Sequence, residues 1–265
     1  MPLPVARPAA VARMIAEYER ELVAMIDAVA PQVRTDAADG GASFGGLLDR
    51  VRAMFGGGSV RRRLVASLGR RAAAGELVAA VAWRRQVEAF VAVRPRISDQ
   101  AEAAVLERSK GGVVSVRRLR DEWVKGNVDL VRSVGRDLHG QLADVLRTAQ
   151  ATGMRHEALA RRIEERFDVA RSRARLIARD QTMKHLAQVQ EAQQAAAGVT
   201  RYTWRHTGSE RNPRPEHVAR DGRVFHWSKP PADGHPGHAI NCRCTAEPVL
   251  EDILGAPGTA RQAAS

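Results

Sequence analysis

The chain has 265 residues, of which 44% are hydrophobic and only 4% aromatic, which excludes a disordered chain and favours helices with an aliphatic core. Its formal charge of +12 favours polyanionic partners, nucleic acid first, and this interpretation weighs evenly with a solvated, arginine-rich surface. No stretch approaches about 20 uncharged apolar residues and the N-terminus lacks an apolar signal core, so we expect no membrane span and synthesis in the cytoplasm.

The first part of the chain is predicted to form helices separated by glycine-rich breaks. Residues 8–31 carry apolar side chains at three- and four-residue steps, which predicts a helix with one apolar stripe. Gly and Asp residues in 35–46 predict a linker, and a short helix over 47–55 is followed by a break over 56–59. Residues 60–94 predict a long basic helix, with Gly69 and Gly75 as candidate interruptions and Pro95 as its end.

The arginines of this basic helix are the candidate contacts for a polyanionic partner. The alternative is that they only coat a solvated helix. The candidate contact residues are Arg61, Arg62, Arg63, Arg70, Arg71, Arg84 and Arg85.

Further helices are predicted up to Gly198. Ser98 or Asp99 can cap a helix that runs to about 109, and residues 116–151 predict another helix with an apolar side. Two more helices are predicted over 156–167 and 169–198, the second stopped by Gly198.

The last of these helices contains Arg179, Asp180 and Gln181. An enzyme interpretation would make Asp180 catalytic, but no second carboxylate or nucleophile lies at a matching spacing. We therefore expect Arg179 and Asp180 to tether the helix to the C-terminal part of the chain by hydrogen bonds or an ion pair.

After Gly198 the pattern becomes that of a small module over 199–250, followed by a tail over 251–265 that we expect to be frayed. Residues 199–206 alternate as in a strand, and Asp221-Gly222 predicts a turn that leads into a second strand. The module holds both cysteines of the chain, Cys242 and Cys244, and five of its eight histidines: His206, His217, His226, His235 and His238. Two cysteines one residue apart make no disulfide framework, and a reducing compartment is the simpler assumption.

These residue types suit a zinc site, because Cys and His are the usual zinc ligands. A small Pro- and Gly-rich module buries little apolar area, so it needs a cross-link such as a bound metal ion to be stable. Cys242, Cys244 and His217 are the first-choice ligands, with His235 or His238 as the fourth. The C-x-C spacing is rarer in zinc sites than C-x2-C. One alternative is that the two cysteines alternate on a short strand, one buried and one exposed, with ordinary surface histidines. Another is that Trp204 and Phe225 pack on the helix that bears Asp180 and both thiols stay free.

A catalytic interpretation of the same segment is an HNH-type nuclease, in which His217 activates water and a metal holds the phosphate. Asp221 and Asn241 would complete the set. His, Asp and Asn are common in loops, and we prefer the turn interpretation of Asp221-Gly222. We therefore expect that the chain is not an enzyme.

Several elements occur in the order found in the phage Mu F-like family of phage head morphogenesis, or minor head, proteins. The matching elements are the helix with Ala178–Thr182, the strand Tyr202–Trp204, Arg214 three residues before His217, Asp221-Gly222, Pro236-Gly237, and Asn241-Cys242-Arg243-Cys244. About residues 116–250 resemble this family, and the first 115 residues carry no matching motif. Where the family often has an aspartate before the histidine, the nearest equivalent here is Glu210.

The resemblance implies a minor structural protein of the head or procapsid of a tailed phage, prophage or gene transfer agent. Expected partners are the portal protein, the major capsid protein and double-stranded DNA, and the apolar stripes of 8–31 and 116–151 suit docking on a partner. The expected fold is mostly α, with a long-helix N-terminal body and a small Cys/His-rich α+β module. The expected ranges are 1–115, 116–198, 199–250 and the tail. A zinc- or HNH-type nuclease acting on DNA is the alternative, and a DNA-binding packaging accessory is a third class.

Overall fold

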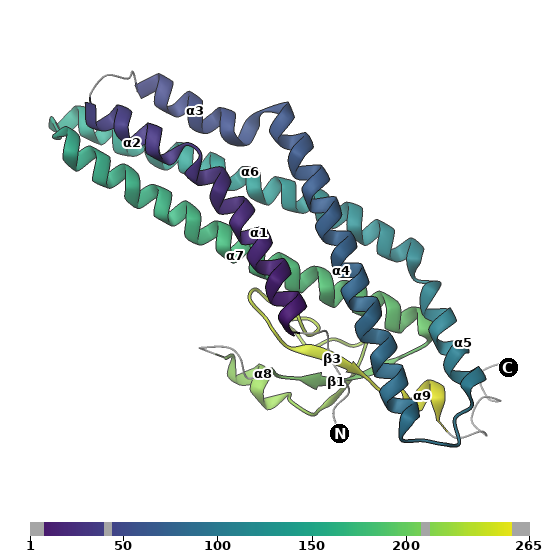
Figure 1. Cartoon of the computed structure of the whole chain (residues 1–265). Coiled ribbons are helices and arrows are strands. Elements are labelled where there is room, and N and C mark those ends of the chain that lie inside the picture. The colour runs from purple at the N-terminus through teal and green to yellow at the C-terminus, as the bar shows by residue number, and fades with distance from the viewer. Residues whose placement is uncertain (1–7, 40–43, 208–212, 256–265) are drawn as a thin grey trace. The chain divides into compact units, whose positions relative to one another are not determined.

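The computed structural model describes residues 8–39, 44–207 and 213–255, which form long helices and one small sheet (Figure 1). The mostly α fold with a small C-terminal α+β module is confirmed. The described residues make two compact units. The first, here called the helical unit, comprises 13–71 and 122–181; the second, the mixed unit, comprises 72–121 and 182–255 together with 8–12. Each unit therefore combines separated ranges of the chain, whereas the ranges expected from the sequence are consecutive.

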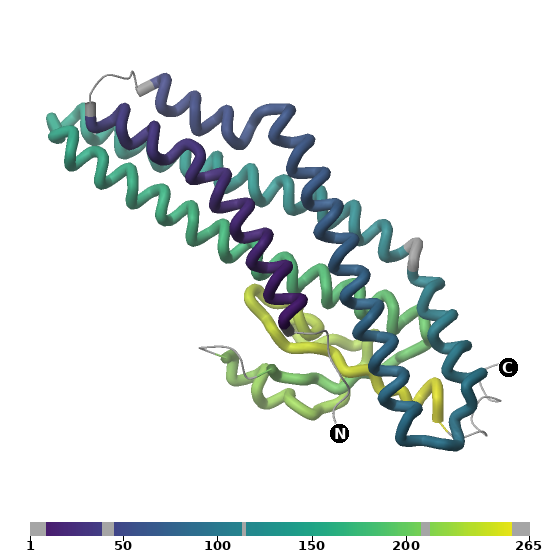
Figure 2. The backbone as a smooth tube through the Cα atoms, in the orientation of Figure 1, coloured from purple at the N-terminus to yellow at the C-terminus, as the bar shows by residue number. Residues whose placement is uncertain are grey.

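The helical unit contains α1 (Pro8–Asp27) from Arg13 onward, α2 (Ala30–Asp39), α3 (Phe44–Gly56) and parts of three longer helices. Those longer helices are α4 (Gly58–Ala92), α6 (Val113–Thr152) and α7 (His156–Ala197). Within this unit α6 and α7 run antiparallel and are joined by a short turn after Thr152 (Figure 2), where Gly153 takes a φ of +63°.

The expected linker over 35–46 is wrong at both ends, because α2 continues to Asp39 and α3 begins at Phe44. Residues 40–43 lie outside the described part of the chain. The expected break over 56–59 shrinks to Gly57, and Gly69 and Gly75 do not interrupt α4. The two helices expected over 156–167 and 169–198 are one helix, α7, because no Gly or Pro lies between them.

The apolar stripe predicted for 116–151 and the part of the first helix's stripe at Tyr18, Leu22 and Ile26 are buried inside the helical unit. They supply this unit's own core, so the reason for expecting them to dock on a partner does not hold. The buried members include Tyr18, Leu22, Ile26, Val128, Val131, Leu138, Leu142 and Leu146. A polar chain crosses this core, since the Tyr18 hydroxyl donates to Asn127 at 3.1 Å and the amide of Asn127 donates to the Trp123 carbonyl at 2.8 Å.

Helix α6 makes one very close approach to α3 through a glycine. A Cβ atom on Gly135 would lie 2.2 Å from Cγ of Phe55, a buried residue of α3. The absence of a side chain at Gly135 therefore lets the Phe55 ring pack against the α6 backbone.

The mixed unit is built around a three-stranded antiparallel sheet in the order β2-β1-β3. Its strands are β1 (Arg201–Arg205), β2 (Val224–His226) and β3 (Thr245–Pro248), and its shorter helices are α5 (Asp99–Lys110), α8 (Pro215–Ala219) and α9 (Glu251–Leu254). Ser98 caps α5 by accepting from the Ala101 amide at 3.2 Å. The tail expected to be frayed is helical in α9, and residues 256–265 lie outside the described range.

Two apolar clusters hold the mixed unit together. One joins α4, α5 and α9 to the end of α7, through Trp83, Val87, Phe90, Val105, Ala197, Val199, Leu250 and Leu254. The other lies under the sheet and consists of Tyr202, Trp204, Cys242, Cys244 and Ala246, with Phe225 and Trp227 at its edge. Both cysteines are therefore core residues. Within the described ranges, none of the helices combines the length and apolarity required to cross a membrane.

Candidate metal centre

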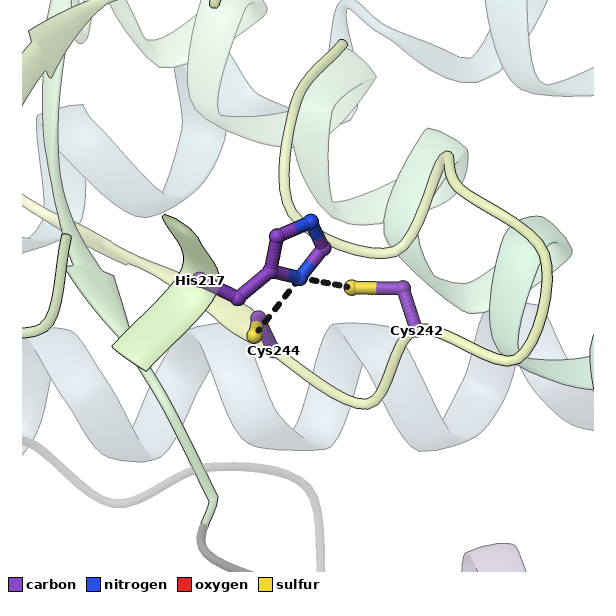
Figure 3. A group of neighbouring side chains, drawn as sticks. All are labelled: His217, Cys242 and Cys244. Atoms are coloured by element: carbon purple, nitrogen blue, oxygen red, sulfur yellow. Dashed lines mark hydrogen bonds between the residues drawn. The ribbon is translucent and has the colours of Figure 1, made fainter. Parts of the chain in front are cut away.

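His217, Cys242 and Cys244 come together in the mixed unit and point toward one another (Figure 3). The Nδ1 atom of His217 lies 3.5 Å from Sγ of Cys242 and 3.5 Å from Sγ of Cys244. All three residues are buried, with 1% or 2% of their surface exposed. Neither cysteine lies in a strand, so the expectation of one buried and one exposed cysteine on alternating faces is wrong.

The loop before β3 places the two sulfurs with three residues in the left-handed region, Gly234, Gly237 and Asn241. Gly237 has a φ of +86°, and its amide donates to Sγ of Cys242 at 3.3 Å. A Cβ atom on Gly237 would lie 2.6 Å from Cβ of Ala187, so the glycine also lets the loop lie directly on α7. Asn241 has a φ of +58°, which Asn tolerates better than most residues, and it turns the chain between the Gly237 loop and the cysteines.

The imidazole of His217 is held on three sides. Its Nε2 atom lies 2.8 Å from Oδ2 of Asp233, whose other carboxylate oxygen accepts from Arg220 at 2.7 Å. An ionised carboxylate only accepts hydrogen bonds, so Nε2 carries a proton, and in the neutral ring Nδ1 then holds the lone pair that faces the sulfurs. The Trp204 ring packs edge-on against the imidazole, with ring centroids 5.1 Å apart.

The electrostatic environment favours the ionised forms of Cys242 and Asp233. The hydrogen bond with Cys244 lowers the pKa of Cys242 to about 6, and burial opposes that shift. Partial burial raises the pKa of Asp233, but the hydrogen bonds from His217 and Arg220 bring it below its ordinary value. A thiolate, a neutral imidazole nitrogen and a carboxylate behind it are the states that metal binding requires.

The distances test whether a metal ion fits. Zn–S bonds of about 2.3 Å and Zn–N bonds of about 2.0 Å place S and N about 3.5 Å apart across a tetrahedral angle. Both S–N separations at His217 match this edge. A hydrogen bond explains only one of them, because the single lone pair of Nδ1 accepts one thiol proton. The His/Cys cluster can therefore hold a metal ion with the three first-choice residues as ligands.

The two histidines expected to supply the fourth ligand have other neighbours. The Nδ1 atom of His235 lies 3.0 Å from the Tyr202 hydroxyl, and burial lowers the pKa of His235. The Nε2 atom of His238 lies 3.5 Å from a carboxylate oxygen of Glu191 on α7. The histidine next to the cluster is His206, directly after β1, whose Nδ1 atom lies 3.6 Å from Sγ of Cys244.

The Asp221-Gly222 turn contacts the end of β1, next to the cluster. Oδ1 of Asp221 accepts from the His206 amide at 2.9 Å, and Gly222 takes a φ of +76° and donates its amide to the Trp204 carbonyl. The predicted turn leading into a strand is confirmed, since β2 begins at Val224. Glu210 lies outside the described residues.

The helix motif Arg179-Asp180-Gln181 lies in the helical unit. Gln181 is well fixed there, because its carbonyl accepts from the Trp123 indole at 2.9 Å and its own amide donates to Asp180 at 2.9 Å. The tether from Arg179 and Asp180 to the C-terminal module stays a prediction, as does any role of Arg243.

The arginines of α4 differ in their surroundings. Arg61, Arg62, Arg63 and Arg70 are exposed. Arg71 pairs with Glu21 at 2.6 Å, and Arg84 pairs with Glu88 one turn along the helix at 2.8 Å. Arg85 is half-buried. Arg61, Arg62, Arg63 and Arg70 are thus the best placed of the candidate contact residues, since Arg84, which is also exposed, pairs with Glu88.

Comparison with known proteins places the His/Cys cluster inside a recognised family segment. Residues 140–247 match the family model described as "Phage Mu protein F like protein", which confirms the resemblance to the phage Mu F-like family. An uncharacterized protein of Haemophilus influenzae (strain ATCC 51907 / DSM 11121 / KW20 / Rd) is 34% identical over 128 residues, which are 48% of this chain and 28% of that protein. The match thus spans little more than a quarter of this relative's length. No solved structure matches the chain.

Proposed function

We propose that this chain is a minor head protein of a tailed phage, a prophage or a gene transfer agent, and that it acts in head morphogenesis. The observation that carries the proposal is the match of residues 140–247 to the phage Mu protein F-like family. That segment includes the turn of α6 into α7, the sheet and the metal cluster. Its place of action is then the virion head or procapsid.

The proposed partners are the portal protein, the major capsid protein and double-stranded DNA during packaging or ejection. The net charge of +12 supports a polyanionic partner. The exposed arginines near the start of α4 are the proposed contact, since their side chains face solvent.

The metal of the Cys/His cluster is zinc in this proposal, and its role is to fold the module. Two thiolates and an imidazole form a donor set that zinc prefers. Cys242 and Cys244 are 25 and 27 residues from His217 in the chain, so one ion would close this loop and join α8 to the start of β3. In such sites the free energy of metal binding contributes directly to folding.

Particle composition tests the head proposal. In cells that carry the gene with its neighbouring head genes, we expect mass spectrometry to find the chain in purified heads or procapsids. A deletion strain should stop producing DNA-filled heads, and the wild-type gene supplied on a plasmid should restore them. Absence of the chain from both mature heads and assembly intermediates would contradict the proposal.

A metal-dependent nuclease is the competing function, and the environment of His217 argues against it. A histidine that activates water must reach solvent and substrate. Here the ring is 1% exposed and is enclosed by two sulfurs, Trp204 and Asp233. Plasmid nicking with added divalent metal, abolished in His217→Ala, would favour the nuclease instead.

A further inference from the structure

Three ligands leave one question open, because a structural zinc site has four protein ligands whereas a catalytic site keeps its fourth position for water or substrate. The described residues around the cluster therefore decide what kind of centre this is. The histidine closest to the sulfurs is His206, which directly follows β1.

We propose that His206 is the fourth zinc ligand, which closes a Cys2His2 site made of His206, His217, Cys242 and Cys244. The inference rests on the proposal that the cluster binds zinc. It assigns the fourth position to the end of β1 and not to the histidines that lie nearer to the cysteines in the chain.

The distance between His206 and Cys244 supports this assignment. The Nδ1 atom of His206 lies 3.6 Å from Sγ of Cys244, which again matches the roughly 3.5 Å between S and N ligands of tetrahedral zinc. The same sulfur lies 3.5 Å from Nδ1 of His217. Cys244 is thus flanked by two imidazole nitrogens at the separation of two ligand edges. Among the described residues, the ligand atoms that all lie within 4.8 Å of one another are those of His217, Cys242 and Cys244, so the His206 ring has to turn further toward these residues when zinc binds.

The backbone around His206 is held in place by a hydrogen bond of its own amide and by the pairing of the strand that precedes it. Its backbone amide donates to Asp221 at 2.9 Å, and the preceding strand pairs with β3 from Tyr202 to Arg205. In that register Arg205 lies opposite Thr245, the residue after Cys244. The sheet itself therefore brings His206 beside Cys244.

The competing histidines, His235 and His238, have other neighbours. His235 contacts the Tyr202 hydroxyl at 3.0 Å and packs against the Trp227 ring. His238 lies beside Glu191 on α7. Either of them would have to leave these neighbours to reach the sulfurs.

A closed site has a consequence for function. With four protein ligands no position is left for a water that attacks a phosphate, so the centre would fix the end of β1, α8 and the start of β3 to one another. A closed site would therefore stabilise the fold, whereas the nuclease alternative requires an open metal position.

Zinc competition with a chromophoric chelator tests the assignment on the full chain. We expect His206→Ala to weaken zinc binding by more than the roughly 10- to 100-fold caused by removing an outer hydrogen-bond partner. His238→Ala, the matched control from the same module, should bind zinc like the wild type. His206→Cys, which restores a ligand at the same position, should recover most of the affinity.

Cobalt substitution gives a second readout that does not depend on stability. The wild type should show the intense absorption of a four-coordinate tetrahedral ion, and His206→Ala should change its energy and intensity as water enters. A wild type without zinc would overturn both the zinc proposal and this inference. A wild type that holds zinc, with His206→Ala binding it equally tightly and giving an unchanged cobalt spectrum, would overturn this inference alone.

Discussion

At the scale of single residues, the geometry of the His/Cys cluster depends on the neighbours Asp233 and Arg220 as well as on His217, Cys242 and Cys244. Asp233 accepts from Nε2 of His217 and is itself held by Arg220, whose guanidinium also lies 5.0 Å from the Trp204 ring centroid. A carboxylate behind a ligating histidine fixes its tautomer and orientation and raises its basicity. Asp233 is thus a positioning residue for His217.

Replacement of Asp233 by Ala should lower the zinc affinity about 10- to 100-fold, because His217 loses the partner that fixes its tautomer. Chelator competition measures the change, and Asp233→Asn, which keeps an acceptor oxygen, should lose less. Asp252→Ala is the matched control, since this aspartate also pairs with an arginine of the mixed unit, Arg201, and has no contact with the cluster. Equal zinc affinity of Asp233→Ala and the wild type would show that the Asp233 contact does not support a metal ligand.

The sequence predicted that His217, Cys242 and Cys244 come together, because two cysteines and a histidine in a short Pro- and Gly-rich segment are typical of a metal site. It did not predict His206 or Asp233, and the reason is geometric. His235 and His238 are nearer to Cys242 along the chain, but β1 pairs with β3 and so brings His206 beside Cys244. Asp233 lies in a loop, where no periodic pattern reveals which ring nitrogen it faces.

At the scale of elements, the many helix-forming residues determine where the helices run, and single glycines such as Gly69 do not end them. Local signals predicted the Ser98 cap, the end of α6 near Gly153 and the strand after Gly198. The predicted interruption at Gly69 failed because packing along a long helix keeps it intact despite one weak residue, and the predicted break before 169 failed because no Gly or Pro lies there. A glycine in a helix can equally be a packing feature, as the contact of Gly135 with Phe55 shows.

Two glycines of α6 should respond in opposite ways to alanine. Gly135→Ala should destabilise the protein by roughly 1–3 kcal/mol, because its Cβ would overlap the Phe55 ring in a packed core. Gly140→Ala is the matched control, with nothing within 4 Å of its added Cβ, and should stabilise the helix by about 0.5–1 kcal/mol. Chemical denaturation measures both changes, and equal stability of the two variants would contradict the close approach of α3 and α6.

At the scale of the whole molecule, the net charge of +12 is explained in this account by binding to a polyanionic partner. If the exposed arginines near the start of α4 bind DNA phosphates, affinity should fall steeply with salt, since each neutralised phosphate releases counterions. Replacing Arg61, Arg62 and Arg63 by Gln should make that salt dependence shallower. Replacement of Arg84, which pairs with Glu88, is the control and should leave it nearly unchanged. An identical salt dependence of the triple variant and the wild type would mean that these arginines only coat a solvated helix.

The account as a whole depends on whether the Cys/His cluster is a zinc centre that folds the C-terminal module. The module's apolar cluster under the sheet contains both cysteines, so loss of the ion would leave two thiols and a histidine in the core without their common partner. The free energy of zinc binding would then be lost from folding.

The most direct measurement is metal analysis of the full chain purified without added zinc, combined with thermal unfolding in the presence and absence of chelator. We predict about one zinc ion per chain, lost together with thermal stability in a Cys242→Ser/Cys244→Ser variant and on chelation. Metal-free protein, with both thiols titratable and the same melting temperature in chelator, would contradict the account.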